Sequence, residues 1–397
     1  MTSQNVPELR LEGFGGEWEI STLGHEVRLI NGRAYSQPEL LESGKYPVLR
    51  VGNFYTNTSW YYSDLELGDK YYADNGDLLY TWSASFGPRV WNGGKVIYHY
   101  HIWKIELGQR LDRNFLLQLL ENDKAAILAN QNGSAMVHVT KEGMEARAIC
   151  FPPTLEEQRA IGAIFTKVDT TIASHKKKLG LLKQTKTSLL QRMFPQDGAM
   201  VPELRLDGFD GEWISRSVAS MADVVTGTTP PTQDTRNYGA YIPFLGPADL
   251  ESAREIAVGK KCLSQQGLRF AREIPPGSTL LVCIGASIGK VGQSSIPVTT
   301  NQQINAIIPS DSRMNDFLFT RIESATGDIT SGSSTQTMPI INKSKLESVP
   351  LDCPPTLEEQ QAIGAVFAKL DAFINAEAQY IDKLTQTKTA LLQKMFV

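Results

Sequence analysis

The sequence predicts an α+β protein with a pseudo-twofold internal repeat, in which two inserts of mixed strands and helices are separated by two long helices forming an antiparallel coiled coil. Two pairs of near-identical segments predict the repeat: VPELRLEGFGGEW at Val6 with VPELRLDGFDGEW at Val201, and PPTLEEQRAIGAIF at Pro152 with PPTLEEQQAIGAVF at Pro354. The stretches between them share little identity. Such a long period excludes a solenoid of short repeats and indicates a duplicated frame that holds two divergent inserts.

The repeat divides the chain into four segments. We expect a first variable domain over 1–151, a first long helix over 152–195, a second variable domain over 196–353 and a second long helix over 354–397. A chain of 397 residues is long enough for two domains that each bury a core.

Composition narrows the class of protein. Hydrophobic residues make up 41% of the chain and charged residues 21%, as in ordinary soluble proteins, and the net charge is −4. No apolar run is long enough for a membrane span, and the first residues do not form a secretory signal. The four cysteines form no C-x-x-C pair, which favours a reducing compartment. We therefore expect a cytoplasmic protein without a metal site.

Each long helix has a start signal. Thr154 and Thr356 stand before Leu-Glu-Glu, with Glu157 or Glu359 three residues later, which is the pattern of a capping box. The two prolines before each threonine disfavour helix upstream and mark the boundary. A helix of about 41 residues would extend about 60 Å, so it needs a partner.

A heptad pattern indicates that the partner of each long helix is the other copy. The core-like positions are Val168, Ile172, His175, Leu179, Leu182 and Leu189 in the first copy, and Leu370, Ile374, Glu377, Ile381, Leu384 and Leu391 in the second. His175 and Glu377 are expected to weaken the seam between the helices. The alternative is two separate helices, each packed on its own insert.

Both inserts contain short apolar runs bounded by Pro and Gly, as expected for strands joined by tight turns. NGDLLYTWSASFGPRVW in the first aligns with PGSTLLVCIGASIGKVG in the second. In this alignment Ser85 and Arg89 match Ser287 and Lys290. A glycine loop with a hydroxyl and a cation suits contact with a phosphate, although a purely structural turn has the same pattern.

Polar loops supply further candidates for DNA contact, because Asn and Gln can read adenine, and Arg and Lys guanine, at base edges. Ordinary solvated loops are the alternative for each residue. The complete set of candidate DNA-contact residues is Arg33, Tyr35, Ser83, Ser85, Arg89, Asn132, Ser134, Thr228, Arg236, Tyr238, Ser287, Lys290, Ser333, Ser334 and Gln336.

Catalytic signatures are missing from the sequence. There is no G-x-S-x-G elbow, no H-E-x-x-H, no dinucleotide-binding glycine pattern and no Asn/Asp-Pro-Pro-Tyr/Phe tetrapeptide typical of adenine methylation. GASIGKV, starting at Gly285, has three residues between its glycines instead of the four of a P-loop. We therefore expect a chain that is not an enzyme and has no cofactor of its own.

Together these features resemble the DNA-specificity (S) subunits of type I restriction–modification systems. The resemblance covers nearly the whole chain and rests on the doubled P-P-T-L-E-E-Q-x-A-I-G-A segments, the two divergent inserts, the S-x-G-(x)-[K/R] loops and TNQQINAIIP at Thr300.

The resemblance implies that each insert is a target recognition domain reading one half of a bipartite, asymmetric site in double-stranded DNA. The paired helices would set the unread spacer between the halves. Two methyltransferase subunits would dock on the duplicated scaffold, and restriction subunits would bind through them. S-adenosylmethionine, ATP and Mg would be used by those partners, which would also supply much of the basic surface.

The main alternative is a two-headed adaptor that binds proteins or glycans. WYYSDLELGDKYY, from Trp60 to Tyr72, favours it most, although we expect these aromatic side chains to lie mostly in the core. A fused restriction–methylation enzyme would need catalytic motifs in the same chain.

Overall fold

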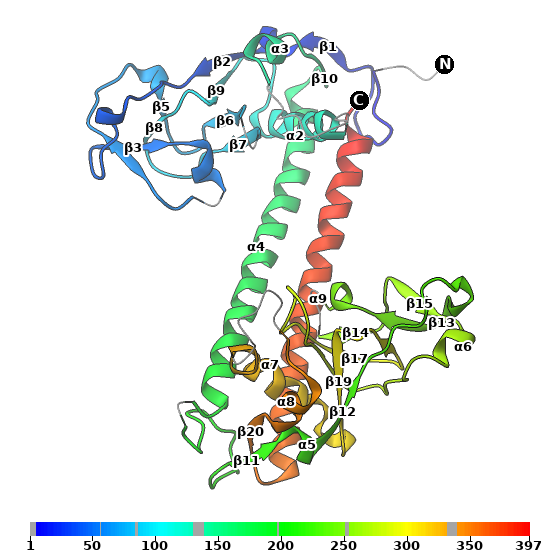
Figure 1. Ribbon diagram of the computed structural model, residues 1–397. Coiled ribbons are helices and arrows are strands. Elements are labelled where there is room, and N and C mark those ends of the chain that lie inside the picture. Colours follow the sequence, from blue (N-terminus) through cyan, green and yellow to red (C-terminus); the bar gives the residue numbers. More distant parts are fainter. Residues whose placement is uncertain are drawn as a thin grey trace. The chain divides into compact units, whose positions relative to one another are not determined.

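The computed structural model describes residues 5–55, 57–83, 86–129, 139–196, 198–250, 254–331 and 340–397. The chain forms two compact units, the first made of Met1–Ser174 with Ile381–Val397 and the second of His175–Tyr380. The predicted fold class is confirmed, since each unit combines sheets with helices and contains one half of each long helix (Figure 1). The division into four sequence segments stays a prediction.

The first unit has two four-stranded sheets and a two-stranded ribbon. In spatial order, the antiparallel sheet consists of β2 (Val27–Asn31), β9 (Ile102–Leu107), β6 (Leu78–Thr81) and β7 (Gly87–Val90). The other consists of β4 (Tyr61–Ser63), β3 (Tyr46–Leu49), β8 (Val96–Tyr98) and β5 (Tyr72–Ala73), and the ribbon of β1 (Glu19–Thr22) and β10 (Ala148–Phe151). The short helices are α1 (Leu23–Glu26), α2 (Arg113–Ala129), α3 (Lys141–Glu145), η1 (Gln37–Glu39), η2 (Val51–Phe54) and η3 (Asp69–Tyr71).

The second unit has the same plan. Its larger sheet consists of β12 (Ala222–Thr226), β19 (Ile304–Pro309), β16 (Thr279–Val282), β17 (Val291–Ser294) and β14 (Glu255–Ile256). The smaller consists of β15 (Lys261–Leu263), β13 (Tyr238–Leu245) and β18 (Thr299–Thr300), and the ribbon of β11 (Ile214–Ser217) and β20 (Pro350–Cys353). The short helices are α5 (Val218–Met221), α6 (Gln265–Leu268), α7 (Asn315–Ser331), α8 (Lys343–Ser348), η4 (Thr235–Asn237), η5 (Pro247–Asp249) and η6 (Ser312–Met314).

The two units repeat one topology although their inserts share little sequence. The order β12-β19-β16-β17 reproduces β2-β9-β6-β7, and the parallel pair β13–β18 reproduces β3–β8. β6 and β16 are buried at every residue, because each is a continuous run of mainly apolar side chains inside its sheet. The shared topology is therefore set by buried strands, while the loops between the strands differ.

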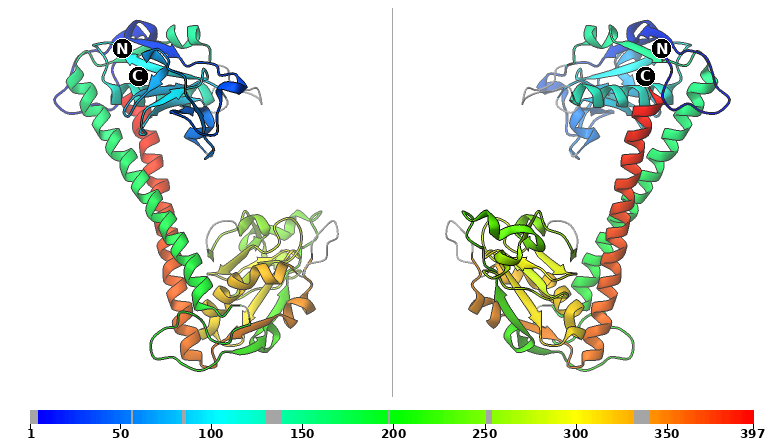
Figure 2. Two further views of the ribbon diagram at one scale, coloured as in Figure 1. Left: turned by 90° about the vertical axis from the view of Figure 1, so that its left-hand side faces the viewer. Right: turned by 90° about the vertical axis from the view of Figure 1, so that its right-hand side faces the viewer.

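The long helices are α4 (Leu155–Met193) and α9 (Leu357–Met395), each of 39 residues. Within each unit, one half of α4 lies beside one half of α9 (Figure 2). All twelve heptad positions proposed from the sequence are buried or half-buried. The predicted core positions are therefore shielded from solvent along both helices.

Contacts in the second unit give the direction of the pair. His175 of α4 contacts Glu377 of α9, and further along α4 Lys186 contacts Asp371 at 2.7 Å. The α9 numbers fall as the α4 numbers rise, so the helices run antiparallel, as predicted.

The start of α4 differs in one respect from the expected capping box. The Thr154 hydroxyl accepts a hydrogen bond from the Glu157 N–H at 3.4 Å, as expected. The Glu157 carboxylate, however, pairs through both oxygens with Arg10, at 2.8 Å each. A bidentate pair with guanidinium is stronger than a single bond to a backbone N–H, which explains the difference.

The second copy repeats this contact. Arg205 pairs through two nitrogens with Glu359, again at 2.8 Å, and both glutamate side chains are 2% exposed. The repeated PELRL segments thus bind the starts of the long helices.

The same segments also bind the ends of the opposite helices. The Leu9 N–H donates to the Lys394 carbonyl at the end of α9, and the Leu204 N–H to the Arg192 carbonyl at the end of α4, both at 2.8 Å. Each unit therefore contains one clasp, which we define as residues 6–18 or 201–213, holding the start of one long helix and the end of the other. This arrangement explains why the VPELRL segments and the PPTLEEQ segments are duplicated together.

Candidate nucleic-acid interface

Each unit has a three-residue turn at the same point of the shared strand order. The first turn, residues 99–101 (His-Tyr-His), joins β8 to β9, and the second turn, residues 301–303 (Asn-Gln-Gln), joins β18 to β19. The His99 N–H donates to the Leu49 carbonyl, and the Asn301 N–H to the Leu245 carbonyl, both at 2.9 Å. The backbone frame is thus shared, but its side chains differ completely.

A glycine packs directly against each turn. A Cβ on Gly32 would lie 2.3 Å from the His99 carbonyl oxygen, and one on Gly227 would lie 2.2 Å from that of Asn301. No side chain fits at such distances, so both positions require glycine.

The residue after each of these glycines is a predicted contact residue. The Arg33 N–H donates to the Tyr98 carbonyl at 3.1 Å, and the Thr228 N–H to the Thr300 carbonyl at 2.9 Å. The Thr228 side chain is exposed and Arg33 is half-buried. The structure therefore brings Arg33 and Thr228 to equivalent positions beside the two turns.

The charge of Arg33 is already paired. Its Nη2 donates to Glu39 at 2.6 Å, and this hydrogen bond holds the pKa of Glu39 at about 2. The guanidinium lies 5.2 Å from the Tyr35 ring centroid. Tyr35 itself packs on Val48, Tyr72 and Ile97, and burial raises the pKa of its hydroxyl. Tyr35 is thus mainly a core residue in this conformation.

The first turn carries an aromatic cluster that the sequence did not single out. Trp82 packs edge-on against His101 with ring centroids 4.8 Å apart, and its Nε1 donates to the Tyr100 carbonyl at 2.9 Å. Tyr100 is 39% exposed. Burial, followed by the neighbouring His101 and Arg50, lowers the pKa of His99 to about 4, so this imidazole is neutral at pH 7.

The second turn carries amides instead of rings. The Gln302 side chain is exposed, and its Oε1 accepts a hydrogen bond from the Thr229 hydroxyl at 2.5 Å. Asn301 Nδ2 donates to Gln303 Oε1 at 3.1 Å. The amides are thus pre-oriented side chains of the type that reads base edges. The sequence signal for this turn was the TNQQ stretch, whose residues were not among the candidate DNA-contact residues.

Arg236 lies in η4, and Tyr238 is the first residue of β13. Arg236 is exposed and forms a bidentate pair with Asp234 at 2.9 Å, which holds the pKa of Asp234 below its usual value. The Tyr238 hydroxyl donates to the Pro230 carbonyl at 3.3 Å, and its ring packs against Phe244. Tyr238 also lines a cavity of about 520 Å³ together with Lys260.

Ser83 lies between β6 and β7, and Arg89 lies within β7. Ser83 is half-buried. Arg89 Nη1 donates to Glu121 at 3.0 Å, and its guanidinium lies 5.4 Å from the Tyr55 ring centroid. Like Arg33, Arg89 has an acidic partner within its own unit.

The corresponding loop of the second unit contains Ser287 and Lys290, both half-buried. The sequence alignment paired Lys290 with Arg89, but the strand register does not. Arg89 stands opposite Leu79, whereas its register equivalent opposite Leu280 is Gly292. The second loop is longer, which shifts the two cations out of register.

Six predicted contact residues lie outside the described residues: Ser85, Asn132, Ser134, Ser333, Ser334 and Gln336. A contact with DNA stays a prediction for every residue of the candidate set.

Comparison with known proteins identifies the frame. The profile of the type I restriction modification DNA specificity domain matches residues 15–184 and again residues 210–386. The chain belongs to the type I DNA-specificity family.

Three relatives are specificity subunits. The chain is 28% identical over 194 residues to the type I restriction enzyme MjaIX specificity subunit of Methanocaldococcus jannaschii, covering 47% of this chain and 44% of that protein. It is 32% identical over 109 residues to the HindI specificity subunit of Haemophilus influenzae, covering 27% and 24%. These two matches span less than half of each relative. The putative MjaX specificity subunit of M. jannaschii is 20% identical over 419 residues, covering 98% and 95%.

Two solved structures share the fold of this specificity-family chain. A type I restriction–modification S subunit from M. genitalium superposes with a TM-score of 0.72 at 15% identity, covering 99% of both chains. A chain from a study of assembly and conformational transition of the type I system gives a TM-score of 0.53 at 19% identity, covering 96% of this chain and 97% of that one.

The aromatic segment that favoured an adaptor is part of the core. Tyr61 and Tyr72 pack in one hydrophobic cluster and Trp60 packs in another. Tyr72 is buried and the other two are half-buried, so this segment forms core as expected and gives the adaptor little support.

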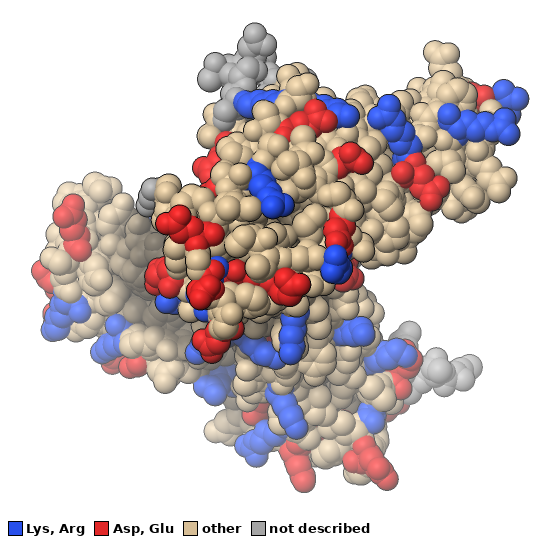
Figure 3. Space-filling model, turned by 90° about the horizontal axis from the view of Figure 1, so that it is seen from below, with Lys and Arg blue, Asp and Glu red and all other residues tan. Residues whose placement is uncertain are grey.

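Surface charge is mixed on the face seen from below in Figure 3, where Lys and Arg are interspersed with Asp and Glu. Within the described ranges, no group of His, Cys, Asp and Glu side chains could hold a metal ion, and no helix is long and apolar enough to cross a membrane.

Proposed function

We propose that this chain is the sequence-recognition subunit of a type I restriction–modification complex, and that each unit reads one half of a bipartite, asymmetric site in double-stranded DNA. The observation that carries this proposal is the pair of equivalent turns. One frame presents His-Tyr-His in the first unit and Asn-Gln-Gln in the second. Two unlike sets of side chains on one frame suit two unlike half-sites.

The long helices set the unread gap between the half-sites. A 39-residue helix is about 58 Å long, enough to extend beyond one DNA turn of about 34 Å. Two recognition domains that face the same side of a duplex need such a fixed separation.

The duplicated clasps present one surface to each of two methyltransferase subunits, and restriction subunits bind through these. The repeated Arg–Glu distances of 2.8 Å in both clasps support two equivalent docking surfaces. In this proposal S-adenosylmethionine, ATP and Mg bind to the partners, and the specificity chain carries out no reaction. The partners also supply basic DNA-facing surface, which accommodates the net charge of −4.

The test is a methylation map. The chain is co-expressed with the methyltransferase encoded beside its gene, in a host without restriction, and N6-methyladenine is mapped at single-base resolution. A two-part motif with one fixed gap, present only when this chain is present, is the expected result. An assembled complex that methylates no motif, or a motif without a gap, would refute the proposal.

A further inference from the structure

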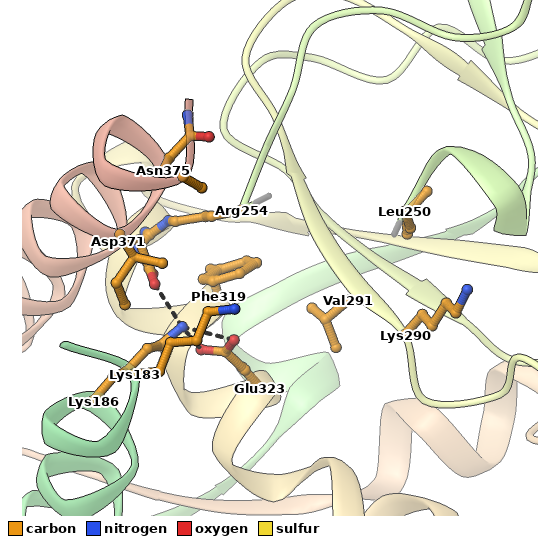
Figure 4. A pocket seen from close by; sticks show the side chains of 12 residues that line it. Lys183, Lys186, Leu250, Arg254, Lys290, Val291, Phe319, Glu323, Asp371 and Asn375 are labelled. Carbon is orange, nitrogen blue, oxygen red and sulfur yellow. Dashed lines mark hydrogen bonds and ion pairs between the residues drawn. The ribbon is translucent and has the colours of Figure 1, made fainter. Parts of the chain in front are cut away.

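A half-buried lysine joins three helices in the second unit. Lys186 of α4 lies with its Nζ 2.7 Å from Asp371 of α9 and 2.7 Å from Glu323 of α7 (Figure 4). The side chains of Lys186 and Asp371 are 14% and 10% exposed, and that of Glu323 is 31% exposed. The pair between Lys186 and Asp371 is therefore largely shielded from water and interacts more strongly than a surface pair.

Arg254 extends this joint. It is 5% exposed and contacts Asp371 at 3.3 Å and Asp316 of α7 at 2.6 Å. Its guanidinium lies 4.4 Å from the Phe319 ring centroid, also on α7. Since α7 packs on β16, β17 and β19, the joint connects the sheet of the second insert to both long helices.

The first unit has a joint of the same origin but with fewer charges. Lys388 of α9 contacts Asp169 of α4 at 2.7 Å, and Gln118 of α2 donates to Asp169 at 3.1 Å. Lys186 and Lys388 occupy the same place in the repeated Thr-Lys-Thr sequence. Among the described residues around Lys388, α2 is therefore linked to Asp169 by a hydrogen bond from a neutral amide, where α7 of the second unit uses ion pairs.

The difference lies in the acidic residue of the insert helix. Glu121 and Glu323 hold equivalent places in α2 and α7, which are both 17 residues long. Glu121 contacts Arg89 of its own insert at 3.0 Å, whereas Glu323 contacts Lys186 of the long helix. Lys186 thus links a long helix directly to the insert helix, whereas among the residues that the structure describes Lys388 pairs only with Asp169 of the other long helix.

We propose that Lys186 is a positioning residue that fixes the orientation of the second insert on the long helices and thereby the length of the unread DNA gap. The inference rests on the proposed function. A change of one base pair in the gap moves a half-site by about 3.4 Å along the duplex and rotates it by roughly a tenth of a turn. If the second insert is held less firmly, the complex accepts DNA sites whose gap differs by one base pair.

The experiment compares methylation maps of the assembled complex containing the wild-type chain, Lys186→Met, Lys186→Arg and Lys183→Met. Methionine keeps the apolar stem without the charge, and arginine keeps the charge. Lys183 is an exposed lysine of α4 that lines a pocket together with Lys186 (Figure 4), so its variant controls for general loss of positive charge.

For Lys186→Met we expect methylation at sites whose gap differs by one base pair to rise by about tenfold, the scale of one mismatched base pair. Lys186→Arg and Lys183→Met should keep the wild-type gap, and Lys388→Met should relax it less than Lys186→Met. A merely structural role would lower methylation at the original sites without admitting new gaps, and that result would overturn the inference.

If Lys186→Met does not yield an assembled complex, Glu323→Gln decides by the same criterion, because it removes the link to α7 and keeps the pair between Lys186 and Asp371. A wild-type chain with a fixed gap and variants with that same gap would refute the inference and leave the proposed function standing. A wild-type chain without a two-part motif would refute both.

Discussion

His175 of α4 and Glu377 of α9 contact each other in the seam of the long helices, at positions that a coiled coil usually fills with apolar side chains. Lys178 contacts the other carboxylate oxygen at 2.8 Å, and Tyr380 packs edge-on against the imidazole. The two polar residues, expected to weaken the seam, are thus partners. The hydrogen bond from Lys178, followed by that with His175, lowers the pKa of Glu377 below its usual 4.5.

Stability of the seam should therefore depend on acid pH. Because the pKa of Glu377 is lower in the folded protein than in the unfolded chain, its charge stabilises the fold above about pH 4.5, and this contribution is lost as the pH falls further. We expect the difference in free energy of unfolding between wild-type and Glu377→Gln chains to be smaller at pH 3.5 than at pH 7, measured by urea denaturation. An equal difference at both pH values would contradict this assignment.

The clasp ion pair should matter more than a surface pair. Arg10→Met leaves the buried Glu157 carboxylate without its bidentate partner, so we expect a loss of about 3 kcal/mol in the free energy of unfolding. Lys394→Met is the matched control, because it removes an exposed pair with Glu8 and should cost less than about 0.5 kcal/mol. Similar losses for the two variants in urea denaturation would show that the clasp does not hold the helix start.

Glycine should be required beside the first turn. Gly32→Ala places a methyl group 2.3 Å from the His99 carbonyl oxygen, so the turn must move, at a cost of about 1–3 kcal/mol. In contrast, a Cβ on Gly180 of α4 meets no atom within 4 Å, and Gly180→Ala should stabilise the chain by up to about 1 kcal/mol. Thermal unfolding compares the two variants. If Gly32→Ala left the unfolding temperature unchanged, the close approach of residue 32 to the turn at His99 would not be needed.

The two turns should act on different half-sites. We expect Tyr100→Ala to weaken binding by about tenfold through the first half-site alone, and Gln302→Ala similarly through the second. Binding of the assembled complex to duplexes with one randomised half-site separates the effects. The Tyr100 variant should lose its defect when the first half-site is randomised. A defect that is independent of which half is randomised would exclude the turns as base-reading elements.

Local signals explain what the sequence could predict. The apolar spacing of α4 and α9, the threonines before their starts and the proline pairs all act within a few residues, so the expected segments 152–195 and 354–397 enclose the helices Leu155–Met193 and Leu357–Met395. The duplication then identified the partner of each helix.

Contacts between distant residues could not be read from the sequence in the same way. Arg10 and Glu157 are far apart in the chain, so the capping box was expected where an ion pair exists. The register that separates Arg89 from Lys290 depends on loop length between paired strands. The first turn was missed because His99 and His101 have no motif of their own, and only folding brings Trp82 beside them.

An exchange of one insert tests the central claim most directly. Residues 214–353 are replaced by the corresponding insert of a specificity subunit with a different target, and the methylation map of the hybrid complex is compared with that of the wild type. The account predicts that one half of the motif changes while the other half stays the same. A hybrid that assembles and methylates but changes both halves, or neither, would contradict the claim that each unit reads its own half-site.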